Sequence, residues 1–570
     1  MTRTTAPAVT SLVSRRTFVQ GLAGSALLLP VAGGTAATAS DAATLTGTDF
    51  ELAIGTVTVD LTGRRRSATL VNGRLPGPVL RWREGDVVAV RVANHLPVPT
   101  SIHWHGMIVP ADMDGVPGLS FHGIPPGGVY RYRFRVNQSG TYWYHSHSRF
   151  QEQTGLYGAI IVSPRGAERH PSARDYVVLL SDWTDADPEH VYRLLKVHPQ
   201  YFNHGQRTLG DTLADAHRDG WPATLAERGM WGRMRMDPTD LADVSGYAYT
   251  YLMNGVTPQG NWTGLFQRGE QVRLRFINGS SMSFFDVRIP GLKLRVVAAD
   301  GQDVEPVSVD EFRIGTAEVL DVIVAPADRP YTIFAQAIDR SGYACGTLAP
   351  QPGLRADVPR VDARPLLSMS DMGMSGSMHD MSSMSMADGA DGEHAAADYG
   401  PTVDMQVLQP QTRLDDPGVG LRNNGRRVLT YADLHTLDGP IDPRAAARDI
   451  ELHLTGHMQR FIWSFNGQKF SASEPLRFNY GERLRLVLVN GTMMNHPIHL
   501  HGMWGELLAE NGDFLVRKHT ITVQPAQRLS YLVTADALGR WAYHCHLLYH
   551  MEAGMFREVV VERPGTDRAG

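Results

Sequence analysis

The residues with the clearest chemical potential lie near the C-terminus, in the run His544-Cys545-His546, with His550 and Met555 shortly after it. A strand-like Trp-Ala-Tyr sequence leads into this run. Side chains of a strand alternate between its two faces, so the two histidines point one way and the cysteine between them points the other. Histidine, cysteinate and a weak axial methionine are the ligands of a blue copper electron-transfer site. The segment therefore predicts a thiolate-bound metal on one face of a strand and imidazole-bound metals on the other.

Three further clusters contain histidines two residues apart, a spacing that places both imidazoles on one face of a strand. They comprise His103 and His105, His145 and His147, and His496, His499 and His501. Ten of the 23 histidines and one of the two cysteines fall in the four clusters. One such pair on a strand is more often incidental than a metal site, but ordinary core and surface histidines do not explain this concentration.

In their order along the chain, the four clusters resemble those of the multicopper oxidases. The resemblance implies four copper ions, one of type 1, one of type 2 and a type 3 pair, and no ligand position departs from the family pattern. The implied ligands of the type 1 copper are His496, Cys545, His550 and Met555. Those of the type 2 copper are His103 and His499, and those of the type 3 pair are His105, His145, His147, His501, His544 and His546.

Oxygen chemistry explains such an arrangement. Reduction of O₂ to water takes four electrons and four protons, and three coppers fed by a fourth hold all the electrons beside the oxygen. Cys545 then carries electrons between the sites. Asp114, which follows the first cluster, occupies the position of a family carboxylate that helps to deliver protons to bound oxygen. An ordinary turn aspartate before glycine is the alternative interpretation of Asp114.

The composition is that of an ordinary globular protein. The ligand residues are spread along the chain, so many structural elements must position them. The chain has 570 residues, of which 42% are hydrophobic and 20% charged. Its 57 glycines and 34 prolines suit many short strands joined by turns. The formal net charge of −5 gives no indication of nucleic-acid binding.

Residues 1–39 predict a targeting signal. The twin-arginine pattern Ser14-Arg15-Arg16-Thr17-Phe18 precedes a short apolar stretch, Gly21 to Val31, and a small-residue cleavage site, Ala37-Thr38-Ala39. The apolar stretch is too short to span a membrane. We therefore expect a periplasmic or exported protein that uses the twin-arginine route, with no stable membrane insertion.

An internal repeat sets the number of domains. Each copy has an Asn-Gly turn, then a glycine, and nine residues later an asparagine that closes an alternating strand. The copies are Asn72-Gly73 with Gly85 and Asn94, Asn254-Gly255 with Gly269 and Asn278, and Asn466-Gly467 with Gly481 and Asn490. Short alternating strands between turns predict an all-β chain of sandwiches. The resemblance implies three consecutive cupredoxin-type Greek-key β-sandwich domains.

The expected domains span residues 45–164, 170–350 and 401–563, and the last carries the type 1 copper. An insertion of loops and short helices is expected at about 185–243, inside the second domain. All ligand clusters lie in the first and third domains, so the three-copper site must lie where these domains meet and the second domain is a spacer. A two-domain protein of the nitrite-reductase type is the alternative, which the three repeats and the complete ligand set disfavour.

A methionine-rich stretch lies in the linker 351–400 between the second and third domains. Its candidate Cu(I) ligands are Met369, Met372, Met374, Met378, His379, Met381, Met384 and Met386. The neighbouring residues are Ser, Gly and Asp, which cannot bury a core, so we expect a flexible segment. Thioether sulfur is a soft ligand that suits Cu(I). The stretch therefore predicts a collector of Cu(I) near the type 1 site, with a plain linker as the alternative.

The methionine-rich stretch, the twin-arginine signal and two short runs resemble the bacterial copper-resistance multicopper oxidases. The runs are Trp231-Gly232-Arg233-Met234-Arg235-Met236 and Gly456-His457-Met458-Gln459-Arg460. The resemblance implies a periplasmic oxidase that couples oxidation of Cu(I) to reduction of O₂, in copper resistance. We expect a monomer, with other periplasmic copper-handling proteins as candidate partners. The alternatives are a laccase-like oxidase that takes electrons from small organic phenols, and a copper-sequestering protein with secondary oxidase activity.

The remaining cysteine and the histidines outside the four clusters are assigned no chemical role. Cys345 and Cys545 are the only cysteines, and the second is assigned to copper, so no intramolecular disulfide is expected. We interpret Cys345 as a buried or idle thiol. Histidines outside the four clusters, His519 among them, have no partner at ligand spacing in the sequence.

Overall fold

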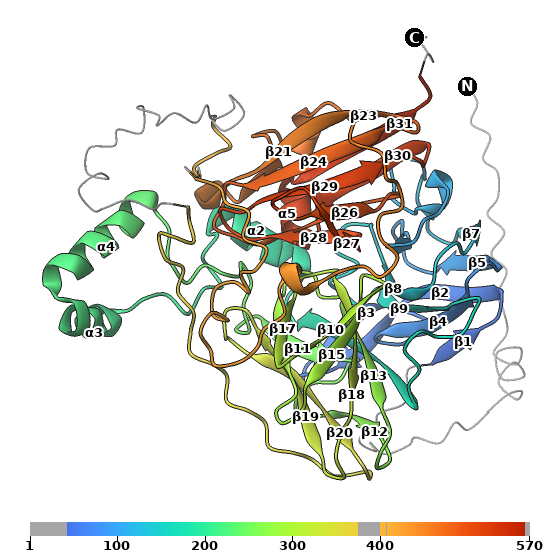
Figure 1. Cartoon of the computed structure of the whole chain (residues 1–570), viewed down its shortest axis with the longest axis horizontal. Helices are drawn as coiled ribbons and strands as arrows, with labels where there is room; N and C mark the ends of the chain where they lie inside the picture. Colours follow the sequence, from blue (N-terminus) through green and yellow to red (C-terminus); the bar gives the residue numbers. More distant parts are fainter. Residues whose placement is uncertain (1–42, 374–399, 406, 408, 565–570) are drawn as a thin grey trace, which may run out of the picture. The chain divides into compact units, whose positions relative to one another are not determined.

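The computed structural model of the protein describes residues 43–373, 400–405, 407 and 409–564. The predicted signal at 1–39 and the part of the methionine-rich stretch from Met374 to Met386 lie outside the described residues. Strands dominate the described chain and form sheets that pair into three β-sandwiches (Figure 1). The all-β prediction is thereby confirmed. Among the described residues, no helix is long and apolar enough to cross a membrane.

The first sandwich carries two of the histidine motifs on adjacent strands. Its elements are β1 Thr44–Thr46, β2 Asp49–Asp60, β3 Arg65–Val71, β4 Gly77–Arg83, β5 Val87–Asn94, β6 His103–His105, η1 Ala111–Met113, β7 Val129–Arg135, β8 Gly140–His145 and β9 Tyr157–Ser163. The strand orders of its two sheets are β1-β4-β9-β8-β6 and β3-β2-β5-β7. Strands β6 and β8 pair antiparallel with His103 opposite His145, so both motifs lie at one edge of a sheet.

The second sandwich contains no ligand motif. Its elements are β10 Arg174–Thr184, α2 Pro188–Val197, α3 Leu209–Asp219, α4 Trp221–Met234, β11 Tyr249–Met253, β12 Trp262–Leu265, β13 Val272–Asn278, β14 Phe285–Arg288, β15 Leu294–Ala299, β16 Gln302–Val309, β17 Glu311–Ile314, β18 Val319–Val324, β19 Tyr331–Ala337 and β20 Tyr343–Ala349. The strand orders are β11-β10-β13-β18-β15-β16 and β12-β20-β19-β14-β17. Both cysteines of the chain are unpaired and buried, Cys345 within β20.

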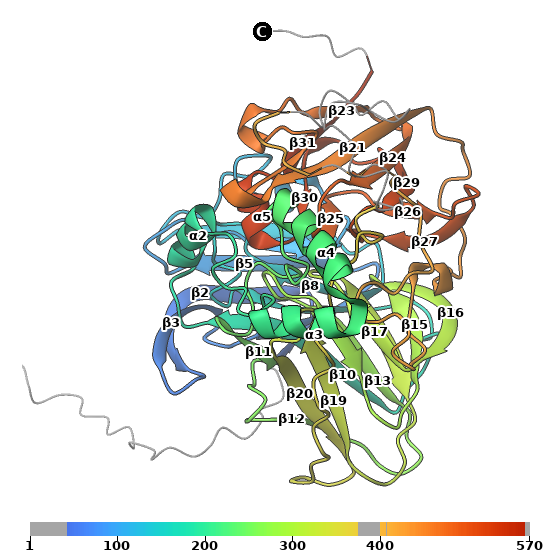
Figure 2. The same cartoon turned by 90° about the vertical axis from the view of Figure 1, so that its left-hand side faces the viewer.

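Three helices fill the expected insertion between β10 and β11. Helix α2 begins after Asp187, whose side chain accepts a hydrogen bond from the backbone N–H of Glu189, and Pro188 occupies its first turn. Thr208 and Asp211 form a capping box at the start of α3. Helices α3 and α4 pack against each other (Figure 2). At 14 residues, α4 is longer than the short helices that we expected.

The third sandwich carries the other two motifs. Its elements are η3 Tyr431–Asp433, β21 Arg448–His457, η4 Met458–Arg460, β22 Ile462–Phe465, η5 Phe470–Ala472, β23 Leu476–Asn479, β24 Arg483–Asn490, β25 His496–Leu500, β26 Gly505–Leu508, β27 Phe514–Lys518, β28 Thr520–Val523, β29 Arg528–Thr534, β30 Gly539–Cys545, α5 Leu548–Ala553 and β31 Phe556–Glu562. The strand orders are β22-β21-β24-β29-β26-β27 and β23-β31-β30-β25-β28. Strands β25 and β30 pair with His499 opposite His544.

The internal repeat marks one structural device that recurs in every sandwich. Asn72, Asn254 and Asn466 all have φ of +51°, a left-handed conformation that asparagine tolerates better than most residues. Each side chain accepts a hydrogen bond of 2.7 Å from a backbone N–H of a preceding strand; the donors are Ala53, Leu179 and His453, respectively. The Asn-Gly dipeptide thus closes a turn and ties it to a strand, which explains its recurrence at equivalent positions.

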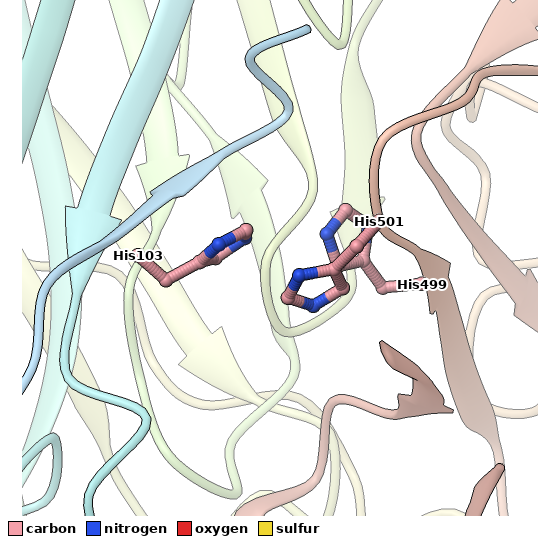
Figure 3. Close-up of side chains that lie close together, drawn as sticks. All are labelled: His103, His499 and His501. Atoms are coloured by element: carbon pink, nitrogen blue, oxygen red, sulfur yellow. The ribbon is translucent and has the colours of Figure 1, made fainter. Parts of the chain in front are cut away.

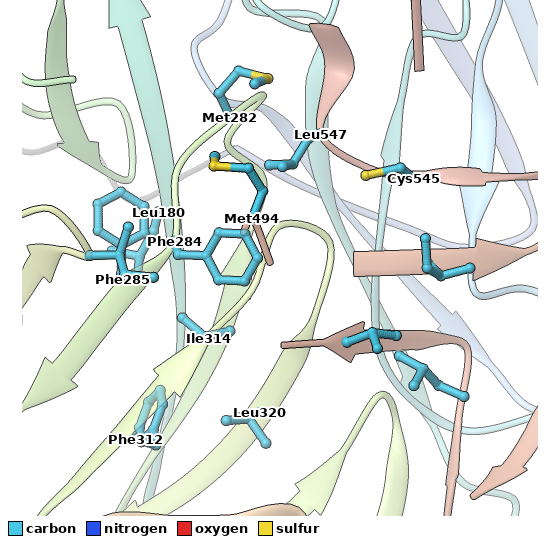
Figure 4. Close-up of a cluster of buried hydrophobic side chains, with 14 of the residues drawn as sticks. Leu180, Met282, Phe284, Phe285, Phe312, Ile314, Leu320, Met494, Cys545 and Leu547 are labelled. Carbon is cyan, nitrogen blue, oxygen red and sulfur yellow. The ribbon is translucent and has the colours of Figure 1, made fainter. Parts of the chain in front are cut away.

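A shared apolar core joins the second and third sandwiches. Figure 4 shows Met282 and Phe284 of the second sandwich beside Met494 and Leu547 of the third, with Cys545 at the edge of the group. Burial of these side chains from water stabilises the contact. Cys545 itself is fully buried. The second sandwich therefore forms part of the apolar surroundings of the cysteine.

Candidate metal centre

The cysteine cluster consists of His496, Cys545, His550 and Met555, and all four residues are fully buried. The Sγ atom of Cys545 lies 3.5 Å from Nδ1 of His496 and 3.8 Å from Nδ1 of His550. The two Nδ1 atoms lie 3.3 Å apart. Strand β25 supplies one histidine, the end of β30 supplies the cysteine, and α5 supplies the other histidine. The three donor atoms form a small triangle, as a trigonal His₂Cys copper site requires.

The outer nitrogens of both histidines in the cysteine cluster have oxygen neighbours. Nε2 of His496 lies 2.7 Å from Oγ1 of Thr492, and Nε2 of His550 lies 2.7 Å from Oδ2 of Asp243. A carboxylate oxygen accepts, so His550 donates its Nε2–H to Asp243 and keeps the lone pair of Nδ1 directed at the sulfur. Contacts of this kind fix the tautomer and ring orientation of metal-binding histidines.

The histidine cluster consists of the eight remaining motif histidines: His103, His105, His145, His147, His499, His501, His544 and His546. Figure 3 shows His103 reaching from the first sandwich toward His499 and His501 of the third. Ligand atoms of these three residues lie within 4.8 Å of one another, as do those of His147, His501 and His544. The structure therefore brings together all four motifs where the first and third sandwiches meet.

Hydrogen bonds direct lone pairs into the histidine cluster. Nδ1 of His544 lies 3.0 Å from the carbonyl oxygen of Cys545, and Nδ1 of His501 lies 2.9 Å from Oδ2 of Asp114. Both oxygens accept, so both Nδ1 atoms carry hydrogen and both Nε2 atoms carry lone pairs. These Nε2 atoms face each other at 3.1 Å. Two lone pairs at this distance repel unless a cation lies between them, which is the condition that a bound metal satisfies.

In a second pair of imidazoles, Nδ1 also donates its hydrogen and Nε2 keeps its lone pair. Nδ1 of His103 donates to the carbonyl oxygen of Asp114 at 2.8 Å, and Nδ1 of His499 donates to that of His519 at 2.6 Å. Their Nε2 atoms are buried and have no hydrogen-bond partner among the described residues. Buried polar atoms are nearly always paired, so an unpaired nitrogen in each of two neighbouring imidazoles indicates a missing ligand.

Burial keeps the cluster imidazoles neutral and able to bind metal. Removal from water, with the other imidazoles close by, lowers the pKa of most of them well below the usual value; these are His105, His145, His147, His499, His501 and His546. For His544 the same burial lowers the pKa to about 3. Burial also raises the pKa of the Cys545 thiol, so a metal must displace its proton.

Comparison with known proteins decides the family. Models described as multicopper oxidase match residues 53–167, 174–351 and 443–565, which together cover most of the chain. The chain belongs to the multicopper oxidases. Copper resistance protein A of Escherichia coli is 55% identical, over 96% of this chain and 99% of the relative. The copper resistance protein A homolog of Pseudomonas syringae pv. tomato is 56% identical, over 96% and 99% of the two chains.

Solved multicopper oxidases share the fold of this one. The crystal structure of Fet3p, a multicopper oxidase that functions in iron import, superposes with a TM-score of 0.64 at 18% identity, over 91% of this chain and 90% of the other. That likeness confirms that the fold consists of three consecutive cupredoxin domains. Copper is therefore the cofactor of this multicopper oxidase, O₂ and a reductant are its substrates, and the donor atoms described above fit copper.

Some residues around the clusters were not predicted from the sequence. His519, which had no partner at ligand spacing, lies with Nδ1 3.2 Å from Nε2 of His105. Glu152 lies 2.5 Å from Nδ1 of His145, and Asp243 reaches His550 from the second sandwich. All are contacts between residues far apart in the sequence or in loops without periodicity. Only the folded chain reveals the contacts of His519 and Asp243, whereas a search of the sequence for carboxylates near histidines would have found Glu152.

The other sequence-predicted site residues divide into two groups. Asp114 lies between the sandwiches, with Oδ1 3.3 Å from Nδ1 of His103 and Oδ2 2.9 Å from Nδ1 of His501. Of the methionine-rich stretch, the structure describes Met369, which is half-buried, and Met372, which is buried in the apolar core. The remaining members from Met374 onward, with His379, lie outside the described residues.

Proposed function

We propose that this multicopper oxidase is a periplasmic enzyme of copper resistance that oxidises Cu(I) to Cu(II) and reduces O₂ to water. The cysteine cluster would hold a type 1 copper, and the histidine cluster would hold a type 2 copper and a type 3 pair, four ions in all. Bound copper supplies one-electron redox chemistry. Relatives named copper resistance protein A, 55% and 56% identical over nearly the full length, support the physiological role.

The chain itself connects the two sites. The sulfur of Cys545 lies in the cysteine cluster, while His544 and His546, its neighbours along the backbone, belong to the histidine cluster. Electrons that enter at the sulfur therefore have a short covalent path to two ligands. Asp114 contacts His103 of the first sandwich and His501 of the third, and it is the carboxylate that would pass protons to oxygen.

A surface hollow supports Cu(I) as the electron donor. The hollow has a volume of about 350 Å³, and His198, Arg235 and Met458 are among its lining residues. Thioether is a soft donor that suits Cu(I), and imidazole is also a copper ligand. Met458 begins η4, and the strand after η4 carries Trp463, whose ring stacks on His550 with the centroids 4.0 Å apart. The hollow is thus close to the cysteine cluster.

The linker that contains the methionine-rich stretch re-enters the described chain at Gly400, beside the same hollow. Nη1 of Arg460 donates to the carbonyl oxygen of Pro401 at 3.1 Å, and the backbone N–H of Met458 donates to Oδ1 of Asp404 at 3.2 Å. Pro401 and Asp404, the first described residues after the linker, therefore lie next to Met458. This adjacency is the observation that carries the proposal, because it brings the end of the linker that contains the methionine-rich stretch to the outer side of the electron-accepting site.

The test measures O₂ uptake by the copper-loaded mature protein with Cu(I) as the sole reductant. We expect about one O₂ for every four Cu(I). Met458→Leu, and replacement of the methionines from Met374 to Met386 by serine, should slow this uptake and leave oxidation of a bulky phenol unchanged. Brisk phenol turnover with little uptake from Cu(I) would contradict the proposal and favour a laccase-like enzyme.

Location and storage need separate measurements. Replacement of Arg15 and Arg16 by lysine should retain the protein in the cytoplasm if export follows the twin-arginine route.

Storage would be the better account of copper resistance if cells that express Cys545→Ser keep their copper tolerance. The mature protein should elute as a monomer in size-exclusion chromatography.

A further inference from the structure

A hairpin of the second sandwich lies between the two ligand-bearing sandwiches. Strands β15 and β16 are joined by Asp300 and Gly301, with φ of +47° and +78°. Two positive φ values in a two-residue loop are typical of the tight hairpin turns that fit twisted strands. The turn touches β8 of the first sandwich so closely that a Cβ atom on Gly301 would collide with the ring of Tyr142, and one on Gly140 would collide with the backbone of Gly301.

The other side of this turn holds the segment 518–520 of the third sandwich. Oδ2 of Asp300 accepts hydrogen bonds of 3.2 Å from the backbone N–H groups of both His519 and Thr520. The ammonium of Lys518 lies 3.0 Å from the same oxygen. The second oxygen, Oδ1, accepts from the backbone N–H of Val319 at 3.0 Å. Asp300 is fully buried, so its charge is balanced and its geometry fixed by these donors.

The segment that Asp300 holds contacts one cluster histidine of the third sandwich and one of the first. The carbonyl oxygen of His519 accepts the Nδ1–H of His499 at 2.6 Å. Oγ1 of Thr520 and Nδ1 of His519 lie 3.1 Å and 3.2 Å from Nε2 of His105. These contacts leave Nε2 of His499 and Nδ1 of His105 unpaired, which are the nitrogens available to a metal among the described residues.

We propose that Asp300 is a positioning residue for the trinuclear copper site. Its carboxylate fixes the backbone of His519 and Thr520, and these residues orient His499 from the third sandwich and His105 from the first. The second sandwich is therefore more than the spacer that the sequence suggests, although it supplies no ligand. This proposal rests on the proposed assignment of His499 to the type 2 copper and of His105 to the type 3 pair.

Asp300 has a left-handed backbone conformation, so the residue that replaces it must tolerate a positive φ. Asparagine adopts positive φ readily and has the shape of aspartate, so Asp300→Asn preserves the turn. It leaves one accepting oxygen for the backbone N–H groups of Val319, His519 and Thr520, and it removes the negative charge beside Lys518. Asp303→Asn is the matched control. Asp303 lies on the same hairpin, half-exposed, with Oδ2 3.5 Å from Nε of Arg169, and its side chain makes no hydrogen bond or ion pair with the segment 518–520 in the described part of the chain.

The experiment compares copper per chain and the electron paramagnetic resonance spectrum in wild type and both variants. Asp300→Asn should retain type 2 copper about 10- to 100-fold less tightly against a chelator and alter its hyperfine splitting, because outer contacts tune metal sites by that order. The blue absorption should not change, and Asp303→Asn should match wild type. A type 2 spectrum and copper retention in Asp300→Asn equal to those of Asp303→Asn would overturn the proposal.

A second variant maintains the test if Asp300→Asn does not fold. Thr520→Val removes only the hydroxyl near His105 and should weaken the near-ultraviolet absorption of the type 3 pair, with the blue absorption intact. An unchanged type 3 absorption in Thr520→Val would also overturn the proposal. Failure of the underlying assignment is distinguishable, because wild type itself would then lack the type 2 and type 3 signatures.

Discussion

The cysteine cluster and the histidine cluster differ in how many parts of the chain build them. All four residues of the cysteine cluster come from one sandwich, on β25, β30, α5 and the residue before β31. The histidine cluster takes four residues from the first sandwich and four from the third, and the second sandwich adjoins it through Asp300. The candidate ligands of the first site therefore come from one domain, with Asp243 of the second sandwich in contact with His550, whereas those of the second site come from two domains.

Loss of the thiolate should separate the two clusters most sharply. Cys545→Ser should abolish the blue absorption and reduce O₂ uptake to the background rate, because the serine hydroxyl does not replace the soft thiolate. Copper bound by the histidine cluster should remain. Cys345→Ser is the control, since Cys345 is the other buried thiol and lies in the second sandwich. The comparison fails if Cys345→Ser loses the blue absorption as well.

Asp114→Asn should damage the histidine cluster alone. The amide removes the negative charge that lies 3.3 Å from Nδ1 of His103 and 2.9 Å from Nδ1 of His501, so we expect about 10- to 100-fold weaker copper binding there. Copper retention and O₂ uptake measure this loss, and the blue absorption should persist. Asp112→Asn, in the same turn and exposed, should behave as wild type. Equal losses in both variants would show that the turn, and not the carboxylate contact, matters.

Acidification should weaken the two clusters unequally. Burial raises the pKa of the Cys545 thiol, so the metal-free thiol is protonated at neutral pH and copper must displace one proton. The apparent affinity of the cysteine cluster should then fall about tenfold for each pH unit of acidification. The imidazoles with lowered pKa are already neutral, so the histidine cluster should depend less on pH. Chelator competition between about pH 6 and pH 8 measures both slopes, and parallel slopes would contradict this account.

The smallest effect is expected at the edge of the methionine-rich stretch. Met372 is buried in the apolar core, so Met372→Leu should cost less than about 1.5 kcal/mol of unfolding free energy. It should leave Cu(I) oxidation unchanged. Thermal unfolding and O₂ uptake provide the measurements. Slower Cu(I) oxidation in Met372→Leu, at normal stability, would assign its thioether to copper after all.

Strand periodicity explains why most of the candidate site could be predicted. Alternation along β30 places Cys545 and His544 on opposite faces, and the structure puts them in different clusters. The three Asn-Gly turns likewise predicted three sandwiches. Contacts made by Asp243, Asp300 and His519 could not be predicted, because each joins residues more than 200 positions apart and no local spacing encodes such a meeting.

The most direct test of the account is the position of copper in the folded protein. Diffraction data collected at the copper edge from crystals of the loaded protein should give one anomalous peak between His496, Cys545 and His550. Three further peaks should lie among the eight residues of the histidine cluster. This result would establish one site within a single domain and one between two. Absence of the first peak, or a histidine cluster with fewer than three, would contradict the account.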